Sequence, residues 1–375
     1  MKTERAFVDI RGVNTHNKGA QLMLMAITAR LGPQYGLAMS PNGADYSSRA
    51  RLGLWQTVLL NQAPLTTRVA GNWLPSKMQD AFGLVSEHRI GAVLDAAGFA
   101  YSDSFSAERS KRETRNFLRW KARGVPTIML PQAFGPFRKS EQRMWSRRLL
   151  ATADAVYARD KQSLTHVKEL DDSIAVELYP DFTIGLKPDG IERQIEGDYA
   201  AIVPNAKMVT HSDMTTEEYF SALVETVRVL DGRGLRSVAV VHEFSDLDLA
   251  KSLSDAVGVQ VYSHRDPLVL KRVLADARLT VASRFHALVS SLASGTPALA
   301  LGWSHKYEEL MEDFGVPGWL AREGDELAAK SLELLDDSNV IGELAQRVTI
   351  LKTRNEHMWD AVERRLSKAE LRLGG

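Results

Sequence analysis

Short apolar segments alternate with longer amphipathic segments along almost the whole chain, and this alternation is the feature that most restricts its fold. The apolar segments have the length of strands and lack alternating polar residues, which is typical of strands covered on both faces. In the first half, the sequence predicts strands at Ala6–Arg11, Ile90–Asp95, Val125–Leu130, Ala155–Ala158 and Val176–Tyr179. It predicts helices between them at Ala20–Leu31, Ala107–Arg123 and Glu141–Ala151.

A second series of the same kind follows. The predicted strands are Ala200–Val203, Ser237–Val241, Val259–Tyr262, Leu279–Ala282 and Ala298–Leu301, and the helices are Thr215–Arg233, Asp246–Ala256 and Pro267–Leu274. Two such series predict an α/β protein with two doubly wound, Rossmann-like domains, each built on a parallel sheet. Since such sheets bind ligands beyond the carboxyl ends of their strands, we expect the two domains to face each other across a ligand-binding cleft.

The polar stretch 186–197 is the expected linker, which divides the chain into an N-terminal domain (1–190) and a C-terminal domain (191–345). The stretch 323–373 is predicted to be helical throughout. Its last part, from residue 346, would form a helix able to pack back on the N-terminal domain. The elements of 40–83 cannot be assigned from the sequence.

Composition excludes several classes of function. Lys plus Arg and Asp plus Glu number 47 each, so no overall positive field indicates nucleic acid. The absence of cysteine excludes disulfides, thiolate metal sites and cysteine nucleophiles. No signal peptide or membrane-spanning segment is recognisable. We therefore expect a cytoplasmic protein, with peripheral association with a membrane left open.

Cations stand at a predicted helix N-terminus, where they are unfavourable. Ser283 is the expected N-cap, which puts Arg284 and His286 in the first turn, beside the positive end of the helix dipole. An anion bound there would explain both, because Arg offers a fork for carboxylate or phosphate and His can transfer a proton. The alternative is an Arg lying along the surface and a His capping a carbonyl.

Two further cations follow predicted strands. Lys306 begins a helix after the strand that ends at Leu301, although it could instead pair with Glu309. Arg159 follows the strand that ends at Ala158, where it could instead form an ion pair that caps the next helix.

Polar residues in other strand-to-helix loops are candidates for substrate binding. Asn14, His16 and Asn17 lie in the first loop, Gln132 lies in a loop after the third strand, and Asp95 ends the second strand. Each has an alternative structural role within its loop. His242 and Glu243 have no third ligand at metal-site spacing, so we expect a metal-free mechanism without a cofactor.

Taken together, these segments resemble the polysaccharide pyruvyl transferase family. The matching segments are NKGAQLML (17–24), LPQAFGPF (130–137), ARDKQS (158–163), PDFTI (180–184) and SRFHALVSSLASGTPALALGWSHK (283–306). The last is the most specific, because it combines Arg-x-His, Gly-x-Pro and Lys at fixed spacing. Family members often have Gly-Asp where this chain has Gly19 and Ala20. Because of this difference, the role that the first loop has in the family does not carry over directly to this chain.

The resemblance implies a fold like that of B-type glycosyltransferases, phosphoenolpyruvate as donor and a saccharide acceptor, which could be lipid-linked. It implies that the N-terminal domain binds the acceptor and also contributes Arg159 to donor binding. In the C-terminal domain, the donor would be bound by Arg284, Phe285, His286 and Lys306. The product in the family is a cyclic pyruvate ketal. Such a transfer needs protonation of the donor's methylene carbon, for which His286 is the expected general acid. His16 and Asp95 are candidates for the base.

Two alternatives remain from the sequence. A nucleotide-sugar glycosyltransferase of the same fold would also bind a phosphorylated donor. Such an enzyme usually has a carboxylate near this helix that binds the ribose of the donor. In this chain the helix from Ser283 to Ala293 contains no Asp or Glu. A non-catalytic glycan-binding relative would fit the altered Gly19 and Ala20 but would not need the predicted acid. The acceptor sugar and the oligomeric state cannot be derived from the sequence.

Overall fold

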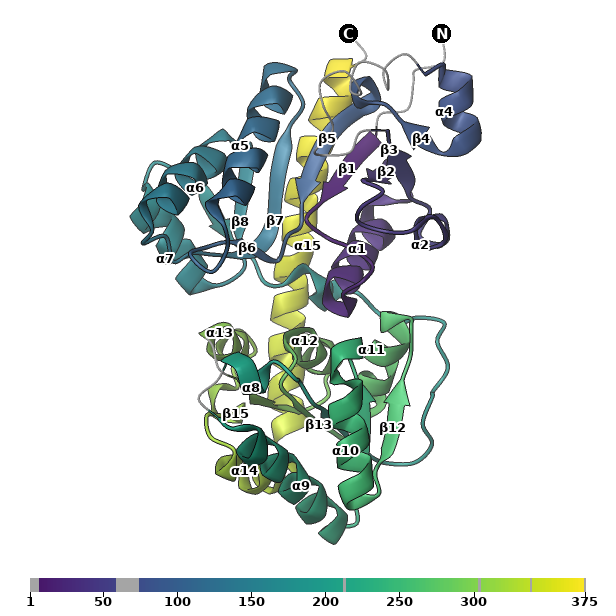
Figure 1. Ribbon diagram of the computed structural model, residues 1–375, viewed down its shortest axis with the longest axis vertical. Helices are drawn as coiled ribbons and strands as arrows, with labels where there is room; N and C mark the ends of the chain where they lie inside the picture. The colour runs from purple at the N-terminus through teal and green to yellow at the C-terminus, as the bar shows by residue number, and fades with distance from the viewer. Residues whose placement is uncertain (1–6, 59–73, 212–213, 303–304, 338, 374–375) are drawn as a thin grey trace. The chain divides into compact units, whose positions relative to one another are not determined.

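The computed structural model describes residues 7–58, 74–211, 214–302, 305–337 and 339–373. It forms two compact units (Figure 1). Unit 1 comprises residues 1–182 and 354–375, and unit 2 comprises residues 183–353. Within the described ranges, no helix combines the length and apolar character that a membrane span requires.

Unit 1 contains a parallel sheet in the order β4-β3-β2-β1-β5-β7-β8-β9, with β6 paired to β7. Its strands are β1 (Phe7–Arg11), β2 (Gly36–Met39), β3 (Trp55–Thr57), β4 (Leu84–Val85), β5 (Ile90–Asp95), β6 (Phe99–Tyr101), β7 (Thr127–Phe134), β8 (Ala155–Ala158) and β9 (Val176–Leu178). Its α-helices are α1 (Lys18–Leu31), α2 (Tyr46–Arg51), α4 (Ser76–Phe82), α5 (Ala107–Ala122), α6 (Ser140–Thr152) and α7 (Lys161–Leu170).

The carboxyl ends of β1 and β5 form the switch point of this sheet, because β1 pairs with β2 on one side and β5 on the other. The loops that follow these two strands pack closely together. Gly12, at φ +80°, approaches Ala97 so closely that a Cβ at this position would lie 2.6 Å from the Ala97 nitrogen. Only glycine satisfies both the backbone conformation and this contact.

Unit 2 contains a second parallel sheet, in the order β12-β11-β10-β13-β14-β15. Its strands are β10 (Ala200–Val203), β11 (Ser237–Val241), β12 (Gln260–Ser263), β13 (Leu279–Ala282), β14 (Ala298–Leu301) and β15 (Leu320–Ala321). Its α-helices are α8 (Met208–His211), α9 (Thr216–Gly232), α10 (Leu247–Val257), α11 (Pro267–Asp276), α12 (Phe285–Ala293), α13 (His305–Asp313), α14 (Asp325–Asp336) and the first part of α15 (Val340–Leu373).

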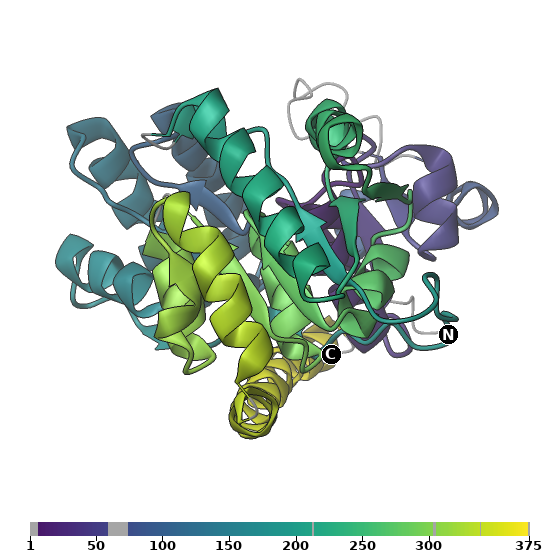
Figure 2. The same ribbon diagram turned by 90° about the horizontal axis from the view of Figure 1, so that it is seen from below.

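Both faces of the unit 2 sheet are buried. Along β10, Ala201 and Val203 belong to one hydrophobic cluster, whereas Ala200 and Ile202 belong to another. Helices α11, α12, α13 and α15 cover the first cluster, and α9, α10 and α14 cover the second. In Figure 2, α9 (teal) and α14 (yellow-green) lie together on this second face. The predicted fold class, two Rossmann-like parallel-sheet α/β parts, is confirmed.

Two predicted element assignments are wrong. The stretch 323–373 contains two helices, α14 and α15, rather than one, and the Asp337 side chain between them accepts a hydrogen bond from the Asn339 nitrogen (2.9 Å). Gln132 lies inside β7 rather than in a loop, since β7 continues to Phe134.

From Arg354 onward, α15 belongs to unit 1, where Arg30 of α1 pairs with Glu356 of α15 (3.0 Å).

Candidate functional site

The switch point of unit 2 lies between β10 and β13. The two strands pair in parallel, with Val203 opposite Ala282, and β11 flanks β10 on its other side. The loops after these three strands therefore begin side by side at the carboxyl edge. In open α/β sheets, this is the position where ligands bind.

Arg284 is the N-cap residue of α12, so the predicted cap at Ser283 is wrong by one position. The Ser283 hydroxyl accepts a hydrogen bond from the Tyr219 hydroxyl (3.2 Å). The Ser283 main chain is also held in the sheet, its nitrogen donating to the Val203 oxygen (3.2 Å). His286 remains in the first turn, as predicted.

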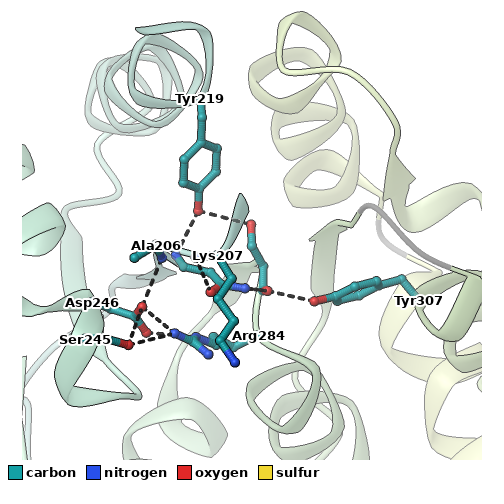
Figure 3. A network of polar contacts seen from close by, with 9 residues as sticks. Ala206, Lys207, Tyr219, Ser245, Asp246, Arg284 and Tyr307 are labelled. Atoms are coloured by element: carbon teal, nitrogen blue, oxygen red, sulfur yellow. Dashed lines mark hydrogen bonds and ion pairs between the residues drawn. The ribbon is translucent and has the colours of Figure 1, made fainter. Parts of the chain in front are cut away.

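The guanidinium of Arg284 is held by a buried carboxylate that the sequence did not reveal. Nε donates to Asp246 Oδ2 (2.8 Å), and Nη2 donates to Asp246 Oδ1 and to Ser245 Oγ (3.3 Å) (Figure 3). Asp246 Oδ1 also accepts from the Ala206 nitrogen (3.0 Å). The Asp246 side chain is fully buried. The protein itself thus places an anion beside this cation, and one carboxylate connects the loops after β10, β11 and β13.

Two buried tyrosines hold the strand ends in place. The Tyr219 hydroxyl accepts from the Asn205 nitrogen (2.9 Å), and the Asn205 side chain donates to the Ser283 oxygen (2.7 Å). The Tyr307 hydroxyl donates to that same oxygen (2.9 Å). Burial raises the pKa of Tyr219 to about 12 and raises the pKa of Tyr307. Both phenols stay protonated near neutral pH and act here as hydrogen-bonding groups.

Lys306 belongs to the helix that carries Tyr307. Its Nζ lies 5.1 Å from the centre of the Tyr307 ring. The glycine before this helix is required by packing, because a Cβ on Gly302 would lie 2.3 Å from the Tyr307 ring. Trp303 and Ser304, part of the predicted motif, lie outside the described residues.

Phe285 and His286 follow Arg284 in the first turn of α12 and are half-buried. The Phe285 ring packs against the core of unit 2 and contacts the His286 ring edge to face, with centroids 5.4 Å apart. This contact fixes the imidazole beside the N-terminus of α12.

Three of the predicted residues in unit 1 lie on or directly after neighbouring strands: Asp95 ends β5, Gln132 lies in β7 and Arg159 follows β8. Both oxygens of Asp95 accept hydrogen bonds, from the Ala97 nitrogen (3.0 Å) and the Tyr101 hydroxyl (2.5 Å), and burial raises the pKa of Asp95. The buried Gln132 side chain lies 3.5 Å from the Asp95 main-chain oxygen. The nitrogen of Arg159 donates to the Gln132 main-chain oxygen (3.1 Å).

Arg159, like Arg284, is paired with a buried carboxylate. Its Nη1 lies 3.5 Å from Asp181 Oδ2, and both side chains are almost fully buried. Asp181 belongs to the PDFTI segment, which gives that motif a structural role: it holds the predicted donor-binding Arg.

The loop between β1 and α1 is organised by its asparagines. Asn14 Oδ1 accepts from the nitrogens of His16 and Asn17, both at 2.9 Å. Asn17 is the N-cap of α1, accepting from the Ala20 nitrogen (2.9 Å). His16 is exposed at the centre of this turn. The loop thus presents His16 beside the switch point of unit 1.

The structure brings Arg284, Phe285, His286 and Lys306 to one edge of unit 2. It brings Asp95, Gln132 and Arg159 to the ends of neighbouring strands in unit 1. The convergence of the two sets on one ligand stays a prediction. No group of three or more metal-binding side chains occurs in the part of the chain that the structure describes.

The fold is similar to that of UDP-GlcNAc 2-epimerases and glycosyltransferases. UDP-GlcNAc 2-epimerase from Neisseria meningitidis, solved bound to UDP-GlcNAc, is similar with a TM-score of 0.61 and 8% identity, over 96% of this chain and 100% of that one. A glycosyltransferase from Rickettsia africae is similar with a TM-score of 0.60 and 10% identity, over 98% of both chains. At such identities the likeness shows the fold alone, which is the glycosyltransferase B-like fold expected from the sequence.

Sequence comparison is more specific. The amylovoran biosynthesis protein AmsJ of Erwinia amylovora is 28% identical over 137 residues, which cover 33% of this chain and 31% of AmsJ. The model of the polysaccharide pyruvyl transferase family matches residues 80–305, more than half of the chain. This region includes Arg159, Arg284 and His286 and ends one residue before Lys306. The chain therefore belongs to the polysaccharide pyruvyl transferase family.

Proposed function

We propose that this protein transfers the pyruvyl group of phosphoenolpyruvate to sugar hydroxyls of a polysaccharide or its precursor, forming a cyclic ketal and releasing phosphate. The main support is the position of the Arg-x-His pair. Arg284 and His286 lie at the carboxyl edge of the unit 2 sheet, at its switch point, within the segment that matches the family.

The donor's charge suits the cations of this edge. Phosphoenolpyruvate carries about −2.5 to −3 charges near pH 7, from one phosphate and one carboxylate. Arg284 is fixed by Asp246 but keeps Nη1 without a hydrogen bond to any described residue. Lys306 and the N-terminus of α12 add positive charge, and Arg159 completes the proposed donor set. The reaction needs no cofactor beyond the donor.

In the proposed reaction, His286 gives a proton to the methylene carbon of the donor, which leaves C2 electrophilic. One sugar hydroxyl attacks C2 and loses its proton. A second hydroxyl of the same sugar then attacks C2 and loses its proton to the departing phosphate, which leaves with the bonding electrons as the ketal ring closes. The cations stabilise the departing phosphate. No residue is assigned as the base.

The acceptor is proposed to be a saccharide. The name of AmsJ refers to the biosynthesis of amylovoran, which favours an acceptor that belongs to polysaccharide synthesis. We place the acceptor on unit 1, beside the loop that contains Asn14, His16 and Asn17. Whether the acceptor is lipid-linked is left to experiment.

The test incubates the full chain with phosphoenolpyruvate and a panel of saccharide acceptors. We expect phosphate release that depends on one acceptor, together with a mass gain of one ketal-linked pyruvyl unit on that acceptor. A thermal-shift measurement on the same protein should show a higher melting temperature with phosphoenolpyruvate and no change with UDP-GlcNAc. Stabilisation by the nucleotide sugar alone would instead indicate a glycosyltransferase. Glycan binding without phosphate release would indicate a non-catalytic relative.

A further inference from the structure

An open pocket of about 300 Å³ lies in unit 2, away from the candidate site. Its wall includes Ala293 and Ser294, where α12 ends, and Ala275, close to the end of α11. Helix α12 begins beside Arg284 at the carboxyl edge of the sheet and runs for nine residues, about 13 Å. The pocket therefore lies at the opposite, amino edge of the sheet, one helix length from the proposed donor-binding residues.

Positive charge is in excess around this pocket. Lys187, Arg272 and Lys352 line it, and Asp189 is the only carboxylate among the described residues that do so. Arg272 Nε donates to Asp276 Oδ2 (2.8 Å), which leaves Nη1 and Nη2 without a hydrogen bond to any described residue. The guanidinium can thus still donate to a ligand.

The two lysines meet at the pocket from opposite ends of unit 2. Lys187 lies near the first residue of this unit and Lys352 near its last. The pKa of Lys352 is lowered, mainly by burial and further by the charge of Lys187. In the part of the chain that the structure describes, neither ammonium donates a hydrogen bond or pairs with a carboxylate, Asp189 included. The two like charges therefore face each other without compensation from the protein.

Helix capping does not account for these lysines. Cations near a helix C-terminus are favourable, and some bind the last carbonyl oxygens directly. At this pocket the protein satisfies such oxygens itself. Thr296 Oγ1 donates to the Ala275 oxygen (2.9 Å), and Ser294 Oγ donates to the Ser290 oxygen (2.8 Å). The lysine ammonium groups donate to neither.

We propose that this pocket is a second ligand site, which binds a small anion through a phosphate group held by Lys187, Lys352 and Arg272. An anion between the two ammonium groups would remove their repulsion, and both Lys and Arg bind phosphate well. The pocket volume is at the lower end of the range for small-molecule sites, so it admits a phosphate with a small organic part. Ile184 and Leu186 provide an apolar wall for that part. The assignment does not rest on the proposed function.

The test measures binding of inorganic phosphate and of glycerol 3-phosphate to the full chain by titration calorimetry. We expect Lys187→Met and Lys352→Met each to raise the dissociation constant roughly ten- to a hundredfold, as loss of one charged hydrogen bond would. Tighter binding of glycerol 3-phosphate would indicate the phosphate of a metabolite, and tighter binding of inorganic phosphate would indicate the ion itself. Hydrogen exchange should show protection of 184–190 by the bound anion.

Two further variants locate the binding. Lys251→Met is the matched control, because Lys251 is exposed on α10 of the same unit and does not line the pocket. Lys306→Met reports binding at the candidate site instead. Without phosphate, Lys352→Met should melt no lower than the wild type, because the substitution removes the repulsion from Lys187.

Unchanged affinity in both pocket variants, or affinity lost only in Lys306→Met, would overturn this second site. So would a wild type that binds neither phosphate compound. None of these outcomes concerns acceptor-dependent turnover of phosphoenolpyruvate, which tests the proposed function separately.

Discussion

The cations of the candidate site are held by carboxylates of the protein itself. Arg284 pairs with the buried Asp246, and Arg159 pairs with the buried Asp181. Breaking a buried ion pair on one side costs about 3–5 kcal/mol, because the remaining charge stays unpaired. Removing either aspartate would therefore test folding rather than chemistry. Substitutions at the exposed end of the site are the informative ones.

His286 is the residue whose loss should separate chemistry from binding. We expect His286→Ala to lower kcat by roughly 10²–10⁴-fold, the usual contribution of a general acid, while phosphoenolpyruvate still binds through the cations. Steady-state kinetics with an identified acceptor and calorimetry with the donor measure the two effects separately. His357→Ala, on an exposed part of α15, is the control. Wild-type turnover in His286→Ala would show that another group protonates the donor.

At the scale of single residues, the sequence predicts which residues lie at strand ends but not which residues they contact. Because a strand-to-helix corner is a local signal, His286 is placed correctly in the first turn of α12, and Arg284 is placed one position off. Asp246 lies 38 residues from Arg284, and Tyr219 lies 64 residues from Ser283. No local pattern connects residues so far apart.

Among the elements, those with local capping signals are predicted best. Thr215 caps α9 in a full capping box with Glu218, and the predicted helix also begins at Thr215. Elements whose limits depend on tertiary contacts are predicted less well. Gln132 is assigned to a loop because the predicted strand ends at Leu130, yet pairing with neighbouring strands extends β7 to Phe134. The break between α14 and α15 also has no signal in the predicted pattern, which runs as helix from 323 to 373.

The contact between the loops after β1 and β5 makes a prediction at the scale of elements. Gly12→Ala should lower the free energy of unfolding by about 2–4 kcal/mol, because the new Cβ would meet the Ala97 backbone and φ is positive. Gly124→Ala is the matched control in unit 1, with φ +69° and no atom within 4 Å of the added Cβ. Gly124→Ala should lower the free energy of unfolding only by the backbone strain, about 1–2 kcal/mol. Urea unfolding measures both, and equal losses would contradict the crowding at Gly12.

At the scale of the whole molecule, the chain leaves unit 1 at residue 182 and returns to it at residue 354. The returning segment of α15 supplies buried side chains to unit 1, namely Met358, Trp359, Ala361, Val362 and Leu366. The larger of these contribute about 1.5–3 kcal/mol each, a sum comparable to the whole stability of a domain. Three acids of the same segment also pair with Arg30.

Ending the chain after Thr353 should therefore unfold unit 1 and leave unit 2 folded, because the hydrophobic clusters of unit 2 end at Leu351. Hydrogen exchange followed by mass spectrometry should show loss of protection in β1, β5 and β7 and retained protection in β10, β11 and β13. Unit 2 serves as the internal control. Retained protection in β1 and β5 would mean that the first 182 residues fold without α15.

The two buried faces of the unit 2 sheet also limit where this protein can change during evolution or engineering. Each residue along β10 is committed to one hydrophobic layer or the other, so the framework tolerates few polar replacements. New donor or acceptor preferences can arise only in the connecting segments at the carboxyl rim. Grafting such segments from a relative should exchange specificity while the scaffold keeps its melting behaviour.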